Sequence, residues 1–377
     1  MDLPAARLWF SVAAIGSFIR SYLQRFLVAL LISIWRQRVV LTLVAIYCLC
    51  GLVAGYLGGL SATAILGLYF LSFNKLLPFI VLSLLIGRAI VIMAVDRPPR
   101  PLSQLWYELR TSLATPERVA HAIPMLAAIF LVGDTFTVLK ASIPNIAAFG
   151  WDQPLDQLDR WLHGGVAPWE LLQPLIGYPL ITHAINWAYN LWFYFLTVIW
   201  VWQAFAQSNN ALRQRFFLSL ILTWMLLGNV FAVLLSSAGP CYFGRVTGLP
   251  DPYAPLMDYL HGVNETYTLW ALGAQEMLWR NHTTGAVVIG SGISAMPSLH
   301  VAMATLFALV CWQVRRWLGM IMACFAGVIM IGSVHLGWHY AIDGYAGAIG
   351  MLIIWWSTGW FVRSANRSDV ELKLEGI

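Results

Sequence analysis

Charged residues are scarce in this chain of 377 residues. Asp, Glu, Lys and Arg together make up 10% of it, too few to cover the surface of a soluble domain of this length. The five cysteines include no CxxC pair, so nothing in the sequence indicates a zinc knuckle or a disulfide framework. The Lys and Arg residues form no stripe with interleaved aromatics, and this argues against a nucleic-acid-binding surface.

Hydrophobic residues are abundant instead. They make up 60% of the chain, and the mean hydropathy is +0.72. A helix crosses a bilayer with about 20 mostly apolar residues, and eight segments fit that length. We therefore predict an all-α integral membrane protein with about eight transmembrane helices. The predicted spans lie at 39–58, 76–95, 121–140, 184–206, 216–237, 298–314, 317–338 and 341–362.

The segment before the first span is also expected to be helical, from residue 5 to 35. Arg7, Arg25 and Arg36 fall on one side of it at about 100° per residue, which favours an amphipathic helix at the interface over a ninth span. The predicted domains are an interfacial or cytoplasmic helix (1–38), two leading spans with a cytoplasmic linker (39–115), a six-helix catalytic membrane domain (116–362) and a cytoplasmic tail (363–377).

The basic residues predict the topology. Cytoplasmic loops carry the excess of Lys and Arg, and most of the 22 such residues fall in alternate compartments that include both ends of the chain. The opposite loops, 141–183 and 238–297, hold few basic residues and many acidic ones. We expect both termini to be cytoplasmic and these two loops to be periplasmic or lumenal. The excess of Arg over Lys favours a bacterial inner membrane over a Golgi membrane.

Two segments place histidines within or beside predicted spans, where ionisable groups are costly and usually functional. One is SAMPSLH, which ends at His300, and the other is HLGWHYAID, from His335 to Asp343. The predicted topology places both at the outer face. If residues 339–343 are helical, Asp343 lies one turn from His339, where it holds one ring nitrogen protonated and leaves the other as a nucleophile.

The remaining histidine completes a phosphoryl-transfer scheme. A second imidazole, that of His300, would protonate the leaving oxygen and then deprotonate the incoming hydroxyl. Pro297 and Ser298 suit the first turn of a helix, whose free N–H groups bind phosphate. Ser298 is therefore a candidate phosphate-binding residue.

These residues resemble the type 2 phosphatidic acid phosphatase superfamily. Pro297 to His300 match its Pro-Ser-x-His pattern, and His339 to Asp343 match its His-x-x-x-Asp pattern. The resemblance implies that His339 is the nucleophile, Asp343 its orienting residue and His300 the acid and base, with neither metal nor organic cofactor.

Four details are more similar to the inositol phosphorylceramide synthase branch of that superfamily. They are Leu299, Tyr340 beside the nucleophile, the segment GPCYF at 239–243 and the Asp-rich segment at 151–165. The branch implies a phospholipid donor and a lipid alcohol acceptor as partners in the bilayer, with no nucleic acid.

The sequence departs from the superfamily where phosphate is bound. The first motif, a Lys followed at a distance by Arg-Pro, is absent, and Ser333 replaces an Arg six residues before the third-motif His. Fewer cations suit a monoanionic phosphodiester better than a dianion. Arg245 is the first candidate cation, and Arg280 and Lys140 are further ones. His335 and Tyr340 are additional candidates for contacts with the phosphate.

The sequence thus predicts a phosphotransferase that moves phosphoinositol from phosphatidylinositol to a lipid alcohol such as ceramide. A lipid phosphate phosphatase acting on phosphatidate or polyprenyl phosphate would use the same three residues and is the alternative. A transporter is a distant second alternative. A metal site built from His335, His339 and Asp343 is a further rival, against which Gly337 argues because it interrupts a continuous helix.

Overall fold

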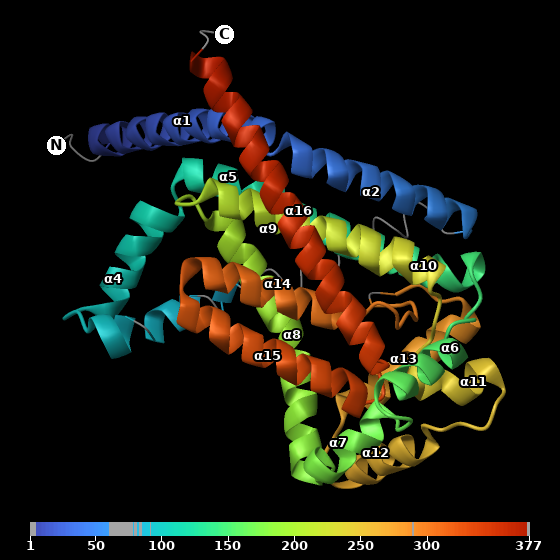
Figure 1. Ribbon diagram of the computed structural model, residues 1–377. Helices are drawn as coiled ribbons and strands as arrows, with labels where there is room; N and C mark the ends of the chain where they lie inside the picture. Colours follow the sequence, from blue (N-terminus) through green and yellow to red (C-terminus); the bar gives the residue numbers. More distant parts are fainter. Residues whose placement is uncertain are drawn as a thin grey trace.

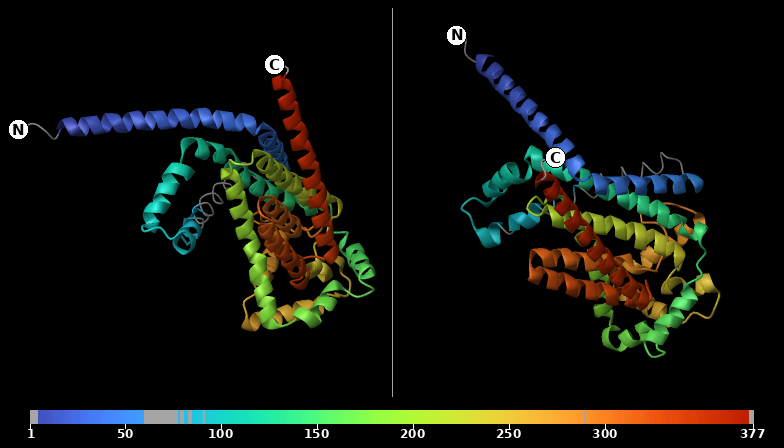
Figure 2. Two further views of the ribbon diagram at one scale, coloured as in Figure 1. Left: turned by 60° about the vertical axis from the view of Figure 1, so that its left-hand side comes forward. Right: turned by 45° about the horizontal axis from the view of Figure 1, so that its top comes forward.

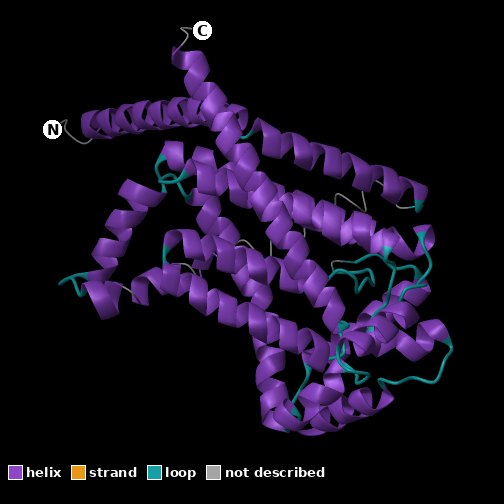
Figure 3. Ribbon diagram, viewed as in Figure 1, coloured by secondary structure: helices purple, strands orange, loops and turns teal. Residues whose placement is uncertain are grey.

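The computed structural model describes residues 5–59, 78, 81–82, 85–90, 92–288 and 290–374. These residues are mostly helical, with loops between the helices, and they include no strand (Figure 3). The predicted all-α fold is therefore confirmed.

Five stretches of helix are long and apolar enough to cross a membrane, and they match five of the predicted spans. All five begin within six residues of the predicted start. They are α2 (Arg38–Leu57), α5 (Pro116–Ile146), α9 (Asn210–Met225) extended through η3 (Leu226–Phe231) and α10 (Ala232–Leu234), α15 (Arg316–His335) and α16 (Ala341–Leu374).

The other three predicted spans are not among these five stretches. α8 (Pro179–Phe205) is long enough at 27 residues, but its His, Asn, Trp and Tyr side chains lower its hydropathy. α14 (Leu299–Val314) is apolar but has only 16 residues. The span predicted at 76–95 lies partly outside the described residues. The count of eight spans and the six-helix core therefore stay predictions.

Side-chain caps explain where several helices start. Thr115 accepts a hydrogen bond from the Arg118 N–H at the start of α5, and Asn209 accepts one from the Leu212 N–H at the start of α9. Each cap satisfies an N–H group that has no partner within the helix.

The remaining helices are shorter and connect the long ones. They are α4 (Pro101–Glu108) and the π-helical turns η1 (Ile92–Asp96) and η2 (Leu109–Leu113), followed further along by α6 (Asp152–Leu162), α7 (Pro168–Ile176), η4 (Pro240–Tyr242), α11 (Phe243–Thr247), α12 (Ala254–Thr266) and α13 (Trp270–Thr284).

The bundle has two different ends. Figures 1 and 2 show α6, α7, α11, α12 and α13 gathered at one end, which we name the loop end. The starts of α5 and α9, the α14–α15 turn and the C-terminal end of α16 lie at the other, which we name the basic end. The loops predicted to share a compartment thus lie at the same end of the bundle.

The helix predicted for residues 5–35 is present as α1 (Ala5–Arg36), which runs alongside the start of α5 (Figure 1). Arg25 forms an ion pair with Glu117 at 2.7 Å, and the Tyr22 hydroxyl donates to the Ala114 carbonyl. The last predicted span, 341–362, matches the apolar stretch Ala341–Ala365, and the helix α16 itself continues to Leu374.

Buried polar contacts join the long helices. The Trp200 indole N–H on α8 donates to the Met125 carbonyl on α5 at 2.9 Å, and the Ser219 and Thr358 hydroxyls link α9 to α16 at 2.7 Å. Since apolar side chains gain little by leaving lipid for protein, such polar contacts help to fix how membrane helices pack.

Candidate active site

The first candidate residue, His300, lies in the first turn of α14 at the loop end. Ser298 is the N-cap of this helix, and its hydroxyl accepts a hydrogen bond from the Val301 N–H. Ser298 is fully buried, and its hydroxyl caps the start of α14. Its predicted contact with phosphate stays a prediction.

Aromatic side chains of α8 fix the His300 ring. Tyr189 stacks on it with ring centroids 4.8 Å apart, and Trp192 lies 4.4 Å away. Phe193 approaches edge-on at 5.9 Å. The Trp192 indole N–H donates to the His300 carbonyl at 2.9 Å, which ties α8 to the start of α14. The imidazole therefore has a well-defined position with little access for water on these sides.

His339 lies in the turn between α15 and α16, and Asp343 lies in the first turn of α16. Residues 339–343 do not form one helix, as Gly337 led us to expect: α15 ends at His335, Gly337 adopts a positive φ of 73°, and α16 begins only at Ala341. A residue with a side chain rarely adopts this φ, so the glycine allows the chain to reverse direction here.

The expected pairing forms all the same. Asp343 Oδ2 lies 3.3 Å from His339 Nδ1 and also accepts the Tyr340 N–H at 3.1 Å. Asp343 is fully buried and His339 is 7% exposed. Because the carboxylate faces Nδ1, it favours the tautomer that carries its proton there and leaves Nε2 free.

The two histidines meet at the loop end. The ring centroids of His300 and His339 are 6.4 Å apart, and the Ser298 N–H donates to the Asp343 carbonyl at 2.9 Å. The structure therefore brings together His300, His339 and Asp343, although 39 residues separate the two histidines along the chain.

A glycine lets α16 approach the start of α14 this closely. A Cβ added to Gly347 would collide with the carbonyl oxygen of Ser298. We expect Gly347→Ala to lower the free energy of unfolding by about 1–3 kcal/mol and to reduce turnover about tenfold or more by displacing His300. Thermal unfolding and an activity assay measure both effects.

Gly327→Ala on α15 is the matched control, since an added Cβ there meets nothing within 4 Å. It should leave stability and turnover unchanged or slightly improved. Equal behaviour of the two variants would show that the contact between α16 and Ser298 is not tight.

Three aspartates of α6 hold the loops around the site. Asp152 accepts the N–H groups of Ala238 and Gly239, both at 2.8 Å, and the Tyr340 hydroxyl at 2.9 Å. Burial raises the pKa of the Asp152 carboxyl, and these donors oppose the rise. Tyr340, a predicted phosphate contact, is thus buried and bonded to Asp152; its predicted role is not tested.

The second aspartate, Asp159, binds the start of α16. It accepts the N–H groups of Ala341 at 2.8 Å and Ile342 at 3.1 Å, where the helix dipole also favours a negative charge. Burial raises the pKa of Asp159, and hydrogen bonds from the backbone counteract this. The third, Asp156, accepts the Tyr253 hydroxyl at 2.7 Å. Sequence reasoning found these aspartates only as part of a resemblance, although their spacing of four and three residues puts them on one helical face.

Removing the Asp159 carboxylate should loosen the turn that carries His339. Asp159→Ala leaves two buried N–H groups without partners, so we expect a loss of about 2–4 kcal/mol in the free energy of unfolding together with reduced turnover. Chemical unfolding in micelles measures the first effect. Asp258→Ala, at an exposed position on α12, is the control and should change little; a similar loss in both variants would contradict the capping role.

Two other predicted binding residues have protein partners. His335 is fully buried, with Nε2 at 2.8 Å from the Thr182 hydroxyl. Arg245, at 47% side-chain exposure, pairs with Glu276 at 3.4 Å and lies over the Trp279 ring. Their binding of phosphate stays a prediction.

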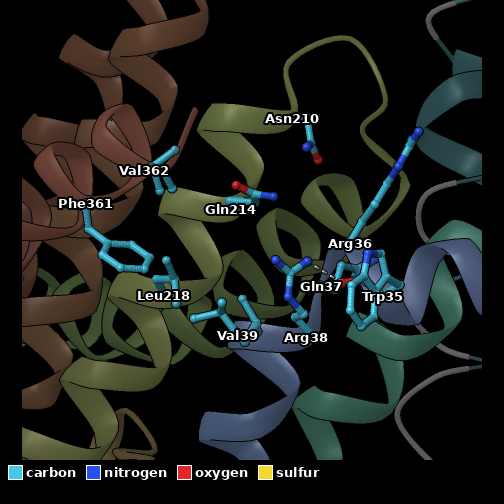
Figure 4. Close-up of a pocket in the computed structure, with 12 residues that line it drawn as sticks. Trp35, Arg36, Gln37, Arg38, Val39, Asn210, Gln214, Leu218, Phe361 and Val362 are labelled. Atoms are coloured by element: carbon cyan, nitrogen blue, oxygen red, sulfur yellow. Dashed lines mark hydrogen bonds between the residues drawn. The ribbon is translucent and has the colours of Figure 1, made fainter. Parts of the chain in front are cut away.

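The basic end contains a cavity of about 420 Å³ (Figure 4). It lies where the α1–α2 junction meets α9 and α16, so it is separate from the two histidines. Its lining combines polar and apolar side chains: Trp35, Arg36, Gln37, Arg38, Val39, Val40, Asn210, Gln214, Leu218, Phe361, Val362 and Ala365.

Comparison with known proteins supports the resemblance seen in the sequence. The family model described as the PAP2 superfamily matches residues 153–357, more than half of the chain, and the match includes His300, His339 and Asp343. No curated protein and no solved structure gave a match. With the matched region and both histidine motifs in place, the chain belongs to the PAP2 superfamily, the type 2 phosphatidic acid phosphatases.

Proposed function

We propose that this protein is a membrane lipid phosphotransferase, which moves a head-group phosphate from a phospholipid to a lipid alcohol through a phosphohistidine on His339. Membership of the PAP2 superfamily fits a lipid phosphatase or phosphotransferase. The observation that carries the proposal is the pair of imidazoles 6.4 Å apart, with a carboxylate on Nδ1 of one of them. This is close enough for both rings to contact one phosphoryl group.

The geometry supports a two-step reaction. His339 Nε2 attacks phosphorus, the bond from phosphorus to the leaving lipid oxygen breaks, and His300 gives that oxygen a proton. In the second step His300 takes the proton of the acceptor hydroxyl, whose oxygen attacks phosphorus and breaks the P–N bond. Asp343 keeps Nδ1 of His339 protonated and stabilises the positive charge of the ring.

The surroundings of His300 favour a lipid acceptor over water. Tyr189 and Trp192 surround its ring with aromatic surface, and this limits the water around the group that would activate the acceptor. Together with the inositol phosphorylceramide synthase-like motifs, this supports phosphatidylinositol as the donor and ceramide as the acceptor. The alternative is a phosphatase acting on phosphatidate or polyprenyl phosphate, which needs the same three residues.

The experiment uses purified protein in mixed micelles with head-group-labelled phosphatidylinositol, with and without ceramide. Label that reaches a new lipid only when ceramide is present, and not in His339→Ala, would support the transferase. Release of water-soluble phosphate from lipid phosphomonoesters without transfer would make the protein a phosphatase.

We also propose that the loop end faces the periplasm or lumen and that both termini are cytoplasmic, in a bacterial inner membrane. The support is that the turns rich in Arg gather at the basic end of the bundle, whereas the first turn of α14, which carries His300, lies at the loop end. Figure 1 shows these two ends. A green fluorescent protein fused after residue 377 should therefore fluoresce in cells. A dark fusion combined with an active C-terminal alkaline phosphatase fusion would reverse the orientation.

A further inference from the structure

The proposed reaction needs a cation to hold the phosphate, and Lys140 is placed to supply it. It lies near the end of α5, at the loop end, and is half-buried. Arg245, the first candidate from the sequence, is engaged with Glu276 instead.

Packing contacts place Lys140 beside the start of α14. Its ammonium group lies over the Phe136 ring, 5.8 Å from the centroid. The Phe136 ring and the Leu299 side chain both border Gly228, so this part of α5 is next to the residue that precedes His300.

The loop before Ser298 also packs on this lysine. Gly292 adopts a positive φ of 96°, and a Cβ added to it would lie 2.7 Å from the Lys140 carbonyl carbon. A residue with a side chain at position 292 would therefore not fit between the loop and α5. The loop that leads to Ser298 thus packs directly against α5 at Lys140.

Lys140 forms no ion pair with any acidic residue in the part of the chain that the structure describes. A cation removed from water is costly unless an anion compensates for it. The Oδ2 atom of the Asp343 carboxylate bonds to His339 and to the Tyr340 N–H. The ammonium group of Lys140 therefore has no anionic partner among the described residues, and a bound phosphate would supply one.

We propose that Lys140 binds the phosphate of the lipid substrate between His300 and His339. This inference rests on the proposed phosphoryl-transfer site, but it does not depend on which lipid accepts the group. The ammonium group would neutralise a non-bridging oxygen while the bond from phosphorus to His339 forms and breaks. A single cation suits the single negative charge of a phosphodiester. Lys140 lies outside residues 153–357, so the family match does not assign it this role.

The test measures binding of orthovanadate, a phosphate mimic, to the full-length protein in micelles without lipid substrate, followed by vanadium NMR. The variants are Lys140→Gln, Lys140→Arg and, as a one-charge control at the exposed basic end, Arg316→Gln. We expect the Kd to rise about 10- to 100-fold in Lys140→Gln, to recover to within a few-fold of the wild-type value in Lys140→Arg, and to stay unchanged in Arg316→Gln.

A structural role would give a different pattern. Because neutralising an uncompensated cation relieves a cost, Lys140→Gln should keep the thermal midpoint of the wild type while it loses anion binding. Equal vanadate affinity in Lys140→Gln and the wild type would overturn the proposal. So would a lower midpoint accompanied by unchanged affinity.

A measurement on the wild-type protein covers the case in which Lys140→Gln does not fold. Vanadate should slow the modification of Lys140 by an amine-reactive reagent, as followed by mass spectrometry, and an unchanged rate would contradict the proposal. Lys140-dependent binding without lipid transfer would refute the transferase and leave this inference standing. Lipid transfer that is equally fast in Lys140→Gln and the wild type would support the transferase and refute this inference.

Discussion

His339→Gln should abolish turnover, with a fall on the order of 10⁴-fold or more, because the variant lacks the nucleophile. Glutamine keeps a polar side chain of similar reach, so the fold should be retained. The measurement is the rate of transfer from labelled phosphatidylinositol, together with mass spectrometry of the acid-labile phosphohistidine. Wild-type protein stopped during turnover should carry the modification on His339, and the variant should carry none.

The same assay separates the two histidines. His300→Gln should lower turnover of natural lipids by about 10²- to 10⁴-fold, because the leaving lipid oxygen then departs without a proton. A substrate with a p-nitrophenolate leaving group needs no such proton, so this variant should cleave it at a rate much closer to that of the wild type. If His300→Gln fails to cleave the activated substrate while His339→Gln still cleaves it, His300 is the nucleophile and His339 is the acid and base.

Asp343→Asn should cost about 10³- to 10⁴-fold in kcat/KM while the protein stays folded. Asp343 Oδ2 contacts both the Tyr340 N–H and His339 Nδ1, so only one group of the amide can take that position. An amide oxygen there keeps both contacts but lacks the negative charge that stabilises the protonated ring. An NH₂ group there loses the Tyr340 bond and favours the tautomer in which Nε2 carries the proton, which cannot attack phosphorus. Michaelis kinetics and thermal unfolding of both proteins test this.

Asp343→Glu is the companion variant, since it keeps the negative charge but moves the carboxylate further from the backbone. Its activity should lie between those of the wild type and Asp343→Asn. If Asp343→Asn keeps full activity, the carboxylate does not control the tautomer and serves only to cap the start of α16.

Much of the bundle could be predicted from apolar length alone. The spans at 39–58 and 317–338 correspond to α2 and α15 because twenty apolar residues between basic ones have few other stable arrangements. α8 was harder to define, since its polar side chains bond to other helices, as Asn186 does to the Ala271 N–H at 3.2 Å.

The candidate site was predictable as a set of residue types but not in its detail. His300, His339 and Asp343 stood out because ionisable groups are rare in this chain, and Gly337 already indicated that α15 would end. The partners of the α6 aspartates could not be predicted, since Asp159 and the Ala341 N–H are 182 residues apart and meet only in the folded chain. The pairing of Arg245 with Glu276 is non-local for the same reason.

The last helix connects the two ends of the molecule. α16 holds Asp343 in its first turn and lines the cavity at the basic end with Phe361 and Val362. At about 1.5 Å per residue, these positions are roughly 28 Å apart on one rigid rod that has no proline. A tilt imposed at one surface of the bilayer, by its thickness or by whatever fills the cavity, therefore moves the carboxylate at the other. In the proposed orientation, the carboxylate that orients His339 would thus respond to the opposite leaflet.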